Sequence, residues 1–554
     1  MTDVLLAYVG TPHFAAPAQR EHLGLAYLTS YLTAAGHRCG FIDAAHEGLA
    51  VDALVARIAR ERPTLVGFSL FLNNTTVTLQ AIQALRRSDC RAHITLGGHH
   101  ATFHWREILA NHPEVDSILR GESELALADL AARLRQGRPW KDTSNLASRD
   151  PSGAPYANPC RPSIADLDGL PPPNREPYRD AIEHSGVTTM VSSRGCYAHC
   201  GFCSVRAFTR LAAGSLWRPR SPAGVVAEIS DLRRRFGAQQ IIFVDDNFMG
   251  PGLAGRRRAG AIADLIRASG LRVQWTFACR ANDLEARTLA RLREAGLVRV
   301  DLGVESWVPR QLELYDKALT PEQNDRAIDL LERLGLDYRL YLIPIDPYVQ
   351  VPELEHTVRQ MQRRGGRHVT HPLFNRLAAF AGTPLAERID RDGLLSRRAG
   401  VCAYEHGTPY RFTDPRMTAV DRALRRLDKS LARTAAAAKA LLPLADAPPP
   451  VLGFAMDWMA AINEAALETA RQVLDAYRRG RPGAASERLR RGNRALAAGV
   501  RRVRRARQEQ SFSTFKPFSV RVGRRMVQFP PPAFAKLQRS LANAAFRGRA
   551  RRAS

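Results

Sequence analysis

Three closely spaced cysteines carry the clearest chemical signal in this 554-residue sequence. Cys196, Cys200 and Cys203 are spaced C-x3-C-x2-C and follow directly after the apolar run 187–191. A strand there would deliver three thiolates to one short loop, with no fourth cysteine nearby. Thiolates are the ligands of iron–sulfur clusters, and three of them leave one iron of a 4Fe-4S cluster without a protein ligand. The spacing therefore predicts a 4Fe-4S cluster with one iron open to a substrate or cofactor.

A structural zinc site is the alternative for the same cysteines. Zinc in such sites usually has four protein ligands, and His199 is the one candidate between the cysteines. Its position inside a tight loop favours a solvated neighbour over a ligand. Cys279, near the end of a predicted strand, is better explained as a small buried residue than as a ligand.

The other cysteines are dispersed, which favours a reducing compartment over a secreted disulfide framework. Met1-Thr-Asp leads straight into a strand-like run, without the pattern of a signal peptide. No apolar stretch reaches the roughly 18 residues of a transmembrane helix. We expect a cytoplasmic protein without a transmembrane segment.

The elements that must position the cysteines begin with a separate amino-terminal unit. Residues 1–140 alternate strand-like and helix-like segments, with glycine at several strand ends, which predicts an α/β fold with a doubly wound parallel sheet. Ligands of such sheets bind beyond the carboxyl ends of the strands. The loops to watch are 10–22, 69–74, 97–102 and 120–124.

The rest of the chain divides into three parts. Residues 141–186 have little periodicity and read as a linker. From 187 to 415 the strand–helix alternation resumes in six units, ending with a predicted strand at 368–374, as in a partial or full βα barrel with chemistry at the strand ends. Residues 416–554 are expected to be a helical, Arg-rich region, with a Phe-rich segment near the end (Phe512, Phe515, Phe518, Phe529 and Phe534) that is expected to pack as core.

The formal charge of +27 and pI near 10.6 point first to nucleic acid or an anionic membrane. Arginine greatly outnumbers lysine and alanine is abundant, a composition that coding bias can produce. We therefore expect nucleic acid to be an unlikely partner and an acidic carrier protein to be a possible one.

The cysteine motif resembles that of the radical S-adenosylmethionine (radical SAM) superfamily. Further segments are similar to the branch of that superfamily with a cobalamin-binding domain. In the barrel these are Trp217-Arg-Pro-Arg-Ser-Pro, Phe243-Val-Asp-Asp-Asn-Phe, Gly303-Val-Glu-Ser and Gly382-Thr-Pro-Leu. Upstream they are Leu23-Gly-Leu-Ala-Tyr-Leu, Gly97-Gly-His-His-Ala-Thr and Arg120-Gly-Glu-Ser-Glu. The resemblance covers about residues 1–415.

This resemblance implies three cofactors: the 4Fe-4S cluster, SAM and cobalamin. It places SAM against Phe202, Asp245, Asp246, Asn247, Glu305 and Ser306. Because carboxylates also favour helix N-termini, the two aspartates could instead be helix caps. It places cobalamin in the loops of a Rossmann-like first domain, with Thr11, His13, Ser69, Gly97, Gly98, His99, Gly121 and Glu122 as candidate contacts.

One cobalamin motif is missing. Many cobalamin domains carry Asp-x-His-x-x-Gly after the first strand, with the histidine as lower axial ligand to cobalt. Here the loop reads Gly10-Thr-Pro-His-Phe-Ala-Ala-Pro. Ordinary loop positions remain the alternative for His13 and His99, so the lower ligand stays open.

By resemblance, the predicted function is a cobalamin-dependent radical SAM C-methyltransferase that acts on an unactivated carbon of a specialised metabolite or its carrier-bound precursor. A cyclase or rearrangement enzyme with the same cofactors is the first alternative, and a radical SAM RNA-modifying enzyme the second. The expected partners are a small-molecule or carrier-tethered substrate and an electron donor such as flavodoxin or ferredoxin. Five arginines near predicted strand ends could hold a carboxylate or phosphate, or form ordinary salt bridges (Arg218, Arg220, Arg280, Arg339 and Arg376).

Overall fold

The amino-terminal domain is built on one seven-stranded sheet with the order β2-β1-β3-β4-β5-β6-β7. The computed structural model describes residues 3–10, 21–88, 90–364, 373–396, 409–439, 449–508, 518–522 and 525–529. The first five strands run parallel: β1 (Val4–Tyr8), β2 (Cys39–Asp43), β3 (Leu65–Ser69), β4 (His93–Gly97) and β5 (Ser117–Leu119). Their apolar residues are almost fully buried because helices cover both faces of the sheet. The predicted doubly wound α/β fold is confirmed.

The helices of this domain are α1 (Leu23–Ala34), α2 (Val51–Glu61), α3 (Thr75–Arg87), α4 (His99–Phe103), α5 (Trp105–Asn111) and α6 (Glu124–Arg135). Because β1 lies between β2 and β3, the strand order reverses direction at β1. Ligands of doubly wound sheets bind at such a switch point, at the carboxyl ends of the strands.

The segment 141–186 is more ordered than its sequence indicated. β6 (Leu146–Arg149) and β7 (Pro155–Ala157) add two antiparallel strands to the edge of the first sheet. α7 (Arg179–Ser185) then leads into the second domain. The predicted boundary at 140 is therefore too early. Strands this short, separated by a Pro- and Gly-containing turn, leave no periodic pattern in the sequence.

The second domain is a curved five-stranded parallel sheet with the order β14-β13-β12-β11-β8. Its strands are β8 (Val187–Met190), β11 (Gln240–Phe243), β12 (Gln274–Arg280), β13 (Leu297–Glu305) and β14 (Asp337–Leu342). The helices between and after them are α9 (Pro222–Phe236), α10 (Gly252–Ala268), α11 (Ala286–Glu294), α12 (Pro309–Leu314), α13 (Pro321–Arg333), α14 (Val351–Arg363) and α15 (Pro384–Arg391). The expected sixth strand at 368–374 lies largely outside the described residues, and a single parallel bridge joins Ile345 to Arg376 nearby.

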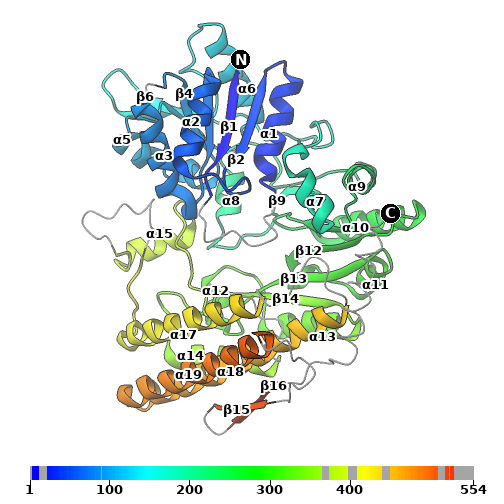
Figure 1. Ribbon diagram of the computed structural model, residues 1–554, viewed down its shortest axis with the longest axis vertical. Helices are drawn as coiled ribbons and strands as arrows, with labels where there is room; N and C mark the ends of the chain where they lie inside the picture. Colours follow the sequence, from blue (N-terminus) through cyan, green and yellow to red (C-terminus); the bar gives the residue numbers. More distant parts are fainter. Residues whose placement is uncertain are drawn as a thin grey trace.

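Three long helices form most of the described part of the carboxyl-terminal region. α17 (Pro415–Lys439), α18 (Pro449–Arg478) and α19 (Pro482–Gln508) pack together, and α18 also lies along α14 of the barrel. Figure 1 shows them at the end of the molecule opposite the amino-terminal domain, with the barrel sheet between. The helical prediction holds, but part of the Phe-rich segment is a hairpin of β15 (Phe518–Val522) and β16 (Arg525–Phe529). Phe512, Phe515 and Phe534 lie outside the described residues.

Among the described residues, no helix combines the length and the apolar character that a membrane crossing requires.

Candidate active site

The cysteine motif lies in the loop between β9 (Ser193–Gly195) and α8 (Ser204–Thr209). β9 pairs antiparallel with β10 (Trp217–Pro219). Gly195 has φ +79, and a Cβ there would stand 2.1 Å from the Leu216 carbonyl oxygen. Only glycine lets the chain pass β10 this closely and turn into the loop. The result is that all three cysteines of the motif come to one loop as free thiols.

Two neighbouring segments hold this loop in place, the turn after β12 and the end of α12. The Tyr197 hydroxyl donates to Asp283, whose other oxygen accepts the Asn247 side-chain amide at 2.8 Å. The Gly201 amide donates to the Tyr315 carbonyl at 2.8 Å. The cysteines are therefore fixed before any cofactor binds, which lowers the ordering cost of binding one.

The donor set fits an iron–sulfur cluster. Burial raises the pKa of the Cys203 thiol to about 12 and also raises the pKa of Cys196, so these thiols become thiolates only beside a positive centre. In the described part of the chain, no three His, Cys, Asp or Glu side chains converge as a single metal ion requires. A cubane needs a wider triangle, because each cysteine binds a different iron.

The predicted SAM residues after β11 separate into two kinds. Asp245 is fully buried, and both its oxygens accept hydrogen bonds from Ser192, with a further one from Ser193. Asn247 likewise bonds Asp283 and the Gly250 amide. Asp245 therefore joins the ends of β8 and β11, and Asn247 joins the ends of β11 and β12, so their oxygens are used within the protein. Asp245 is not a helix cap either, since α10 begins only at Gly252.

Asp246 differs because its side chain lines a cavity. One carboxylate oxygen accepts the Gly195 amide at 3.1 Å. Burial, together with the negative charge of the neighbouring Asp245, raises the pKa of Asp246 to about 6. A bound cation would offset that burial cost, so Asp246 fits the ammonium group of SAM.

The other predicted SAM residues are Phe202, within the cysteine loop, and Glu305 and Ser306, at the end of β13. Glu305 pairs with Lys317 at 2.8 Å, and the Ser306 hydroxyl donates to Gln311 at 2.6 Å. The Phe202 ring packs edge-on against Tyr315 at 5.6 Å between centroids. Glu305 and Ser306 thus lie at a barrel strand end, whereas Phe202 belongs to the loop that carries the cysteines.

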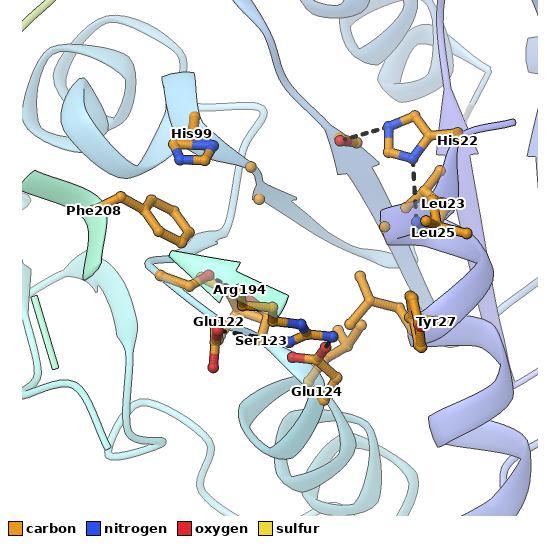
Figure 2. A pocket seen from close by; sticks show the side chains of 18 of the residues that line it. His22, Leu23, Leu25, Tyr27, His99, Glu122, Ser123, Glu124, Arg194 and Phe208 are labelled. Carbon is orange, nitrogen blue, oxygen red and sulfur yellow. Dashed lines mark hydrogen bonds and ion pairs between the residues drawn. The ribbon is translucent and has the colours of Figure 1, made fainter. Parts of the chain in front are cut away.

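A cavity of about 470 Å³ lies between the amino-terminal domain and the barrel. Figure 2 shows His22 on one side of it and His99 with Phe208 on the other. Six of the predicted cobalamin contacts lie on its first-domain side: Ser69, Gly97, Gly98, His99, Gly121 and Glu122. Val191, Gly195, Val244 and Asp246 line its barrel side. Thr11 and His13 lie outside the described residues.

The first-domain side of this cavity is largely apolar and carries glycine at several positions. Gly67, Gly97 and Gly121 line it beside Leu6, Phe68 and Leu96, so backbone forms part of the wall. Such a cradle accepts a flat apolar group, as the nucleotide base or corrin edge of cobalamin is. The residues present therefore fit cobalamin.

His22 orients the hydroxyl of Ser69, which lines the cavity. Its Nδ1 accepts the Leu25 amide at 3.1 Å, so the ring proton must be on Nε2, which lies 3.0 Å from Ser69 Oγ. Burial lowers the pKa of His22 to about 4, which keeps the ring neutral. Ser69 thus accepts from His22 and keeps its own proton for an acceptor in the cavity. Both ring nitrogens of His22 are occupied within the protein.

Ion pairs form the polar wall between the two domains. Arg218 donates to both oxygens of Glu122 and to the Ile164 carbonyl, and Arg194 bridges to Glu124 at 2.7 Å. Arg194 of β9 and Arg218 of β10 therefore fasten the segment after β5, which contains Glu122 and Glu124, to the two paired strands on either side of the cysteine loop. Of the other arginines, Arg220 pairs with Glu228 and Arg376 with Asp421, which is the ordinary role that the sequence left open for them.

Comparisons with known proteins divide the chain at the same place. Residues 16–131 match the B12 binding domain, and residues 190–361 match the radical SAM superfamily. The chain is a B12-binding radical SAM protein. The predicted cofactors of this combination are thereby confirmed: a 4Fe-4S cluster, SAM and cobalamin.

Individual relatives of this B12-binding radical SAM protein differ in activity. It is 28% identical over 376 residues to an uncharacterized methyltransferase of Pyrococcus horikoshii, covering 67% of this chain and 79% of the relative. It is 30% identical over 322 residues to the anaerobic magnesium-protoporphyrin IX monomethyl ester cyclase of Rubrivivax gelatinosus, covering 56% of each chain.

The fold also matches solved structures. Against the radical enzyme OxsB with aqua-cobalamin and S-adenosylmethionine bound, the TM-score is 0.78 at 18% identity, over 93% of this chain and 82% of that one. Against the methyltransferase TsrM from Kitasatospora setae with cobalamin and a [4Fe-4S] cluster, it is 0.60 at 17% identity, over 75% and 86%.

Sequence reasoning missed several residues of the B12-binding radical SAM site. His22, Tyr27, Arg194 and Phe208 line the cavity but belong to no predicted contact set. Two signals were available: Arg194 is adjacent to Gly195 in the cysteine motif, and His22 ends the first predicted ligand loop, 10–22. The others are ordinary residues of α1 and α8 that become site residues only when the two domains meet.

Proposed function

We propose that the chain is a C-methyltransferase that moves a methyl group from SAM, by way of cobalamin, to an unactivated carbon of a specialised metabolite or its carrier-bound precursor. The observation that carries this proposal is the single cavity shared by the two domains. Ser69 and Gly97 of the B12-binding domain and Asp246 of the barrel line the same space. Groups held by the two domains could therefore meet without crossing solvent.

The chain supplies binding, orientation and exclusion of water. When bound, the cluster provides the electron that cleaves SAM, and cobalamin carries the methyl group. Asp246 holds the SAM ammonium group, with one oxygen kept in place by the Gly195 amide. Phe202, within the cysteine loop, and Glu305, at the end of β13, flank the SAM site. The largely apolar cavity wall keeps water from the reacting groups.

For this reaction the protein needs two partners that bind from outside the cavity. A one-electron donor such as flavodoxin or ferredoxin reduces the cluster. A small molecule, free or tethered to an acidic carrier protein, enters as substrate.

The first test is anaerobic reconstitution with iron, sulfide and hydroxocobalamin, followed by desalting and metal analysis. We expect about four irons and one cobalt per chain. Cys200→Ala should lose iron and keep cobalt, because the two cofactors bind to different domains. Iron retained at the wild-type level in Cys200→Ala would refute the cluster assignment, and wild-type protein without cobalt would refute the cobalamin route.

The second test follows the methyl group. With methyl-labelled SAM and reductant, a methyltransferase should release S-adenosylhomocysteine in step with transfer of the label. The alternative with a specific observation in its favour is a cyclase or rearrangement enzyme, because of the 30% identity to the magnesium-protoporphyrin cyclase. That alternative predicts 5′-deoxyadenosine without a matching amount of S-adenosylhomocysteine.

A further inference from the structure

Arg280, the last residue of β12, lies against the cysteine loop. Its side chain is almost completely buried, and its Nη1 donates to Cys200 Sγ at 3.0 Å. Its Nη2 donates to the Lys317 carbonyl, and its Nε lies 3.3 Å from the Asn282 side-chain oxygen. All three guanidinium nitrogens are thus held by separate segments. A planar fork with three fixed partners has little freedom to turn away from the sulfur.

The carbonyl that holds Arg280 is presented by unusual backbone. Asp316 has φ +47 and Ala318 has φ +49, so left-handed residues flank Lys317 on both sides. The Lys317 ammonium pairs with Glu305, which has φ +63 itself. Each such residue costs about 1 kcal/mol or more, and strain of this kind persists where surrounding contacts impose it.

Tight packing fixes the ion pair in turn. A Cβ on Gly303 would stand 2.9 Å from a Glu305 oxygen and 3.0 Å from the Lys317 nitrogen. The register of β13 against β14 also shifts between Gly303 and Glu305. A chain of contacts therefore runs from Glu305 through Lys317 and Arg280 to Cys200, with little room to relax.

We propose that Arg280 raises the reduction potential of the cluster through its N–H···S bond to Cys200, and that Lys317 and Glu305 act as positioning residues for it. This rests on the proposed function, in which Cys200 is a cluster ligand. Reduction adds one electron from an external donor, breaks no bond and leaves one more negative charge on the cluster. A buried guanidinium and a hydrogen bond to sulfur both stabilise that charge.

The test is a redox titration of the reconstituted full-length protein with titanium(III) citrate, followed by electron paramagnetic resonance. Arg280→Gln should lower the equilibrium constant for cluster reduction about tenfold, which is 59 mV for a one-electron couple. The matched control is Arg149→Gln. Arg149 also donates from all three guanidinium nitrogens, to the carbonyls of Leu109, His112 and Val115, but it lies in the first domain. Its loss should leave the potential unchanged.

A second measurement detects the contact between Arg280 and the cluster without removing the positive charge of Arg280. With arginine labelled with ¹⁵N in the guanidinium group, electron–nuclear double resonance of the reduced wild-type cluster should show a nitrogen coupling. Arg280→Lys keeps the charge and should abolish that coupling. A wild-type cluster without the coupling, or Arg280→Gln with four irons and an unchanged potential, would overturn the inference alone. Failure of the wild-type chain to bind iron would overturn the proposed function with it.

Discussion

The ion pair between Arg218 and Glu122 should couple the two domains measurably. Their side chains are 6% and 18% exposed, and Arg218 donates to both carboxylate oxygens and to the Ile164 carbonyl. Breaking a buried pair by removing one partner costs about 3–5 kcal/mol. Arg194 remains 3.6 Å from Glu122 and offsets part of that loss. We therefore expect Arg218→Met to lower the free energy of unfolding by about 3 kcal/mol.

Urea unfolding of the full apo chain, followed by circular dichroism, gives this loss. A double-mutant cycle with Glu122→Gln separates the pair from the cost of changing either side chain. We expect a coupling energy of about 2 kcal/mol, because Glu122→Gln removes the buried charge that Arg218→Met leaves without its partner. Strictly additive single losses, or a loss below about 0.5 kcal/mol for Arg218→Met, would refute the reasoning.

The pH dependence provides a further check on the same pair. Burial favours the neutral form of Glu122, but the hydrogen bond from Arg218 and the charges of Arg194 and Arg218 outweigh it and lower the pKa of Glu122. A lowered pKa stabilises the fold above the unfolded value of about 4.3, and this stabilisation is lost as the pH falls through the folded pKa. In Arg218→Met the hydrogen bond and the charge of Arg218 are lost, so the effect of burial on the pKa of Glu122 is less opposed. The difference in unfolding free energy between the wild type and the variant should therefore be largest near neutral pH and decrease as the pH falls.

Three other changes test separate parts of the site. Asp246→Asn should weaken SAM binding at least tenfold in equilibrium dialysis while leaving the iron content unchanged, and equal affinity would remove Asp246 from the SAM site. Gly97→Leu should abolish cobalt binding with little loss of stability, because a Cβ there meets only an ordinary contact at 3.9 Å; Gly483→Leu, with open space around it, is the control. Ala318→Gly should raise the free energy of unfolding by about 1 kcal/mol, since glycine tolerates φ +49; a loss of stability would contradict the strain argument.

The sequence could predict much of the fold because the signals are local. Alternation of apolar strands and amphipathic helices, with glycine at strand ends, identified the doubly wound sheet and the barrel. β6 and β7 escaped because they are three or four residues long and have no period. The composition indicated the helical carboxyl-terminal region. The hairpin of β15 and β16 was not predicted, because no strong local sequence pattern indicates that these two strands pair.

The candidate site shows the same division. Spacing alone brought Cys196, Cys200 and Cys203 to one loop, since residues a few positions apart cannot lie far from each other. Asp245 and Asp246 are identical in type and adjacent in the chain. The Asp245 carboxylate is hydrogen-bonded to Ser192 and Ser193, whereas the Asp246 carboxylate faces the cavity. Successive side chains after a strand point in different directions, and only the packed neighbours decide which one stays available.

By itself, the sequence determined the chemistry that this protein can hold: three thiolates for a cluster, and a glycine-rich sheet edge for a second cofactor. Only the tertiary structure decided how these parts meet. The shared cavity, the neutral His22, the Arg194 and Arg218 bridges and the Arg280 contact all join residues distant in the chain. Their energies depend on burial and on distances of a few ångströms, which no local pattern of residue types encodes.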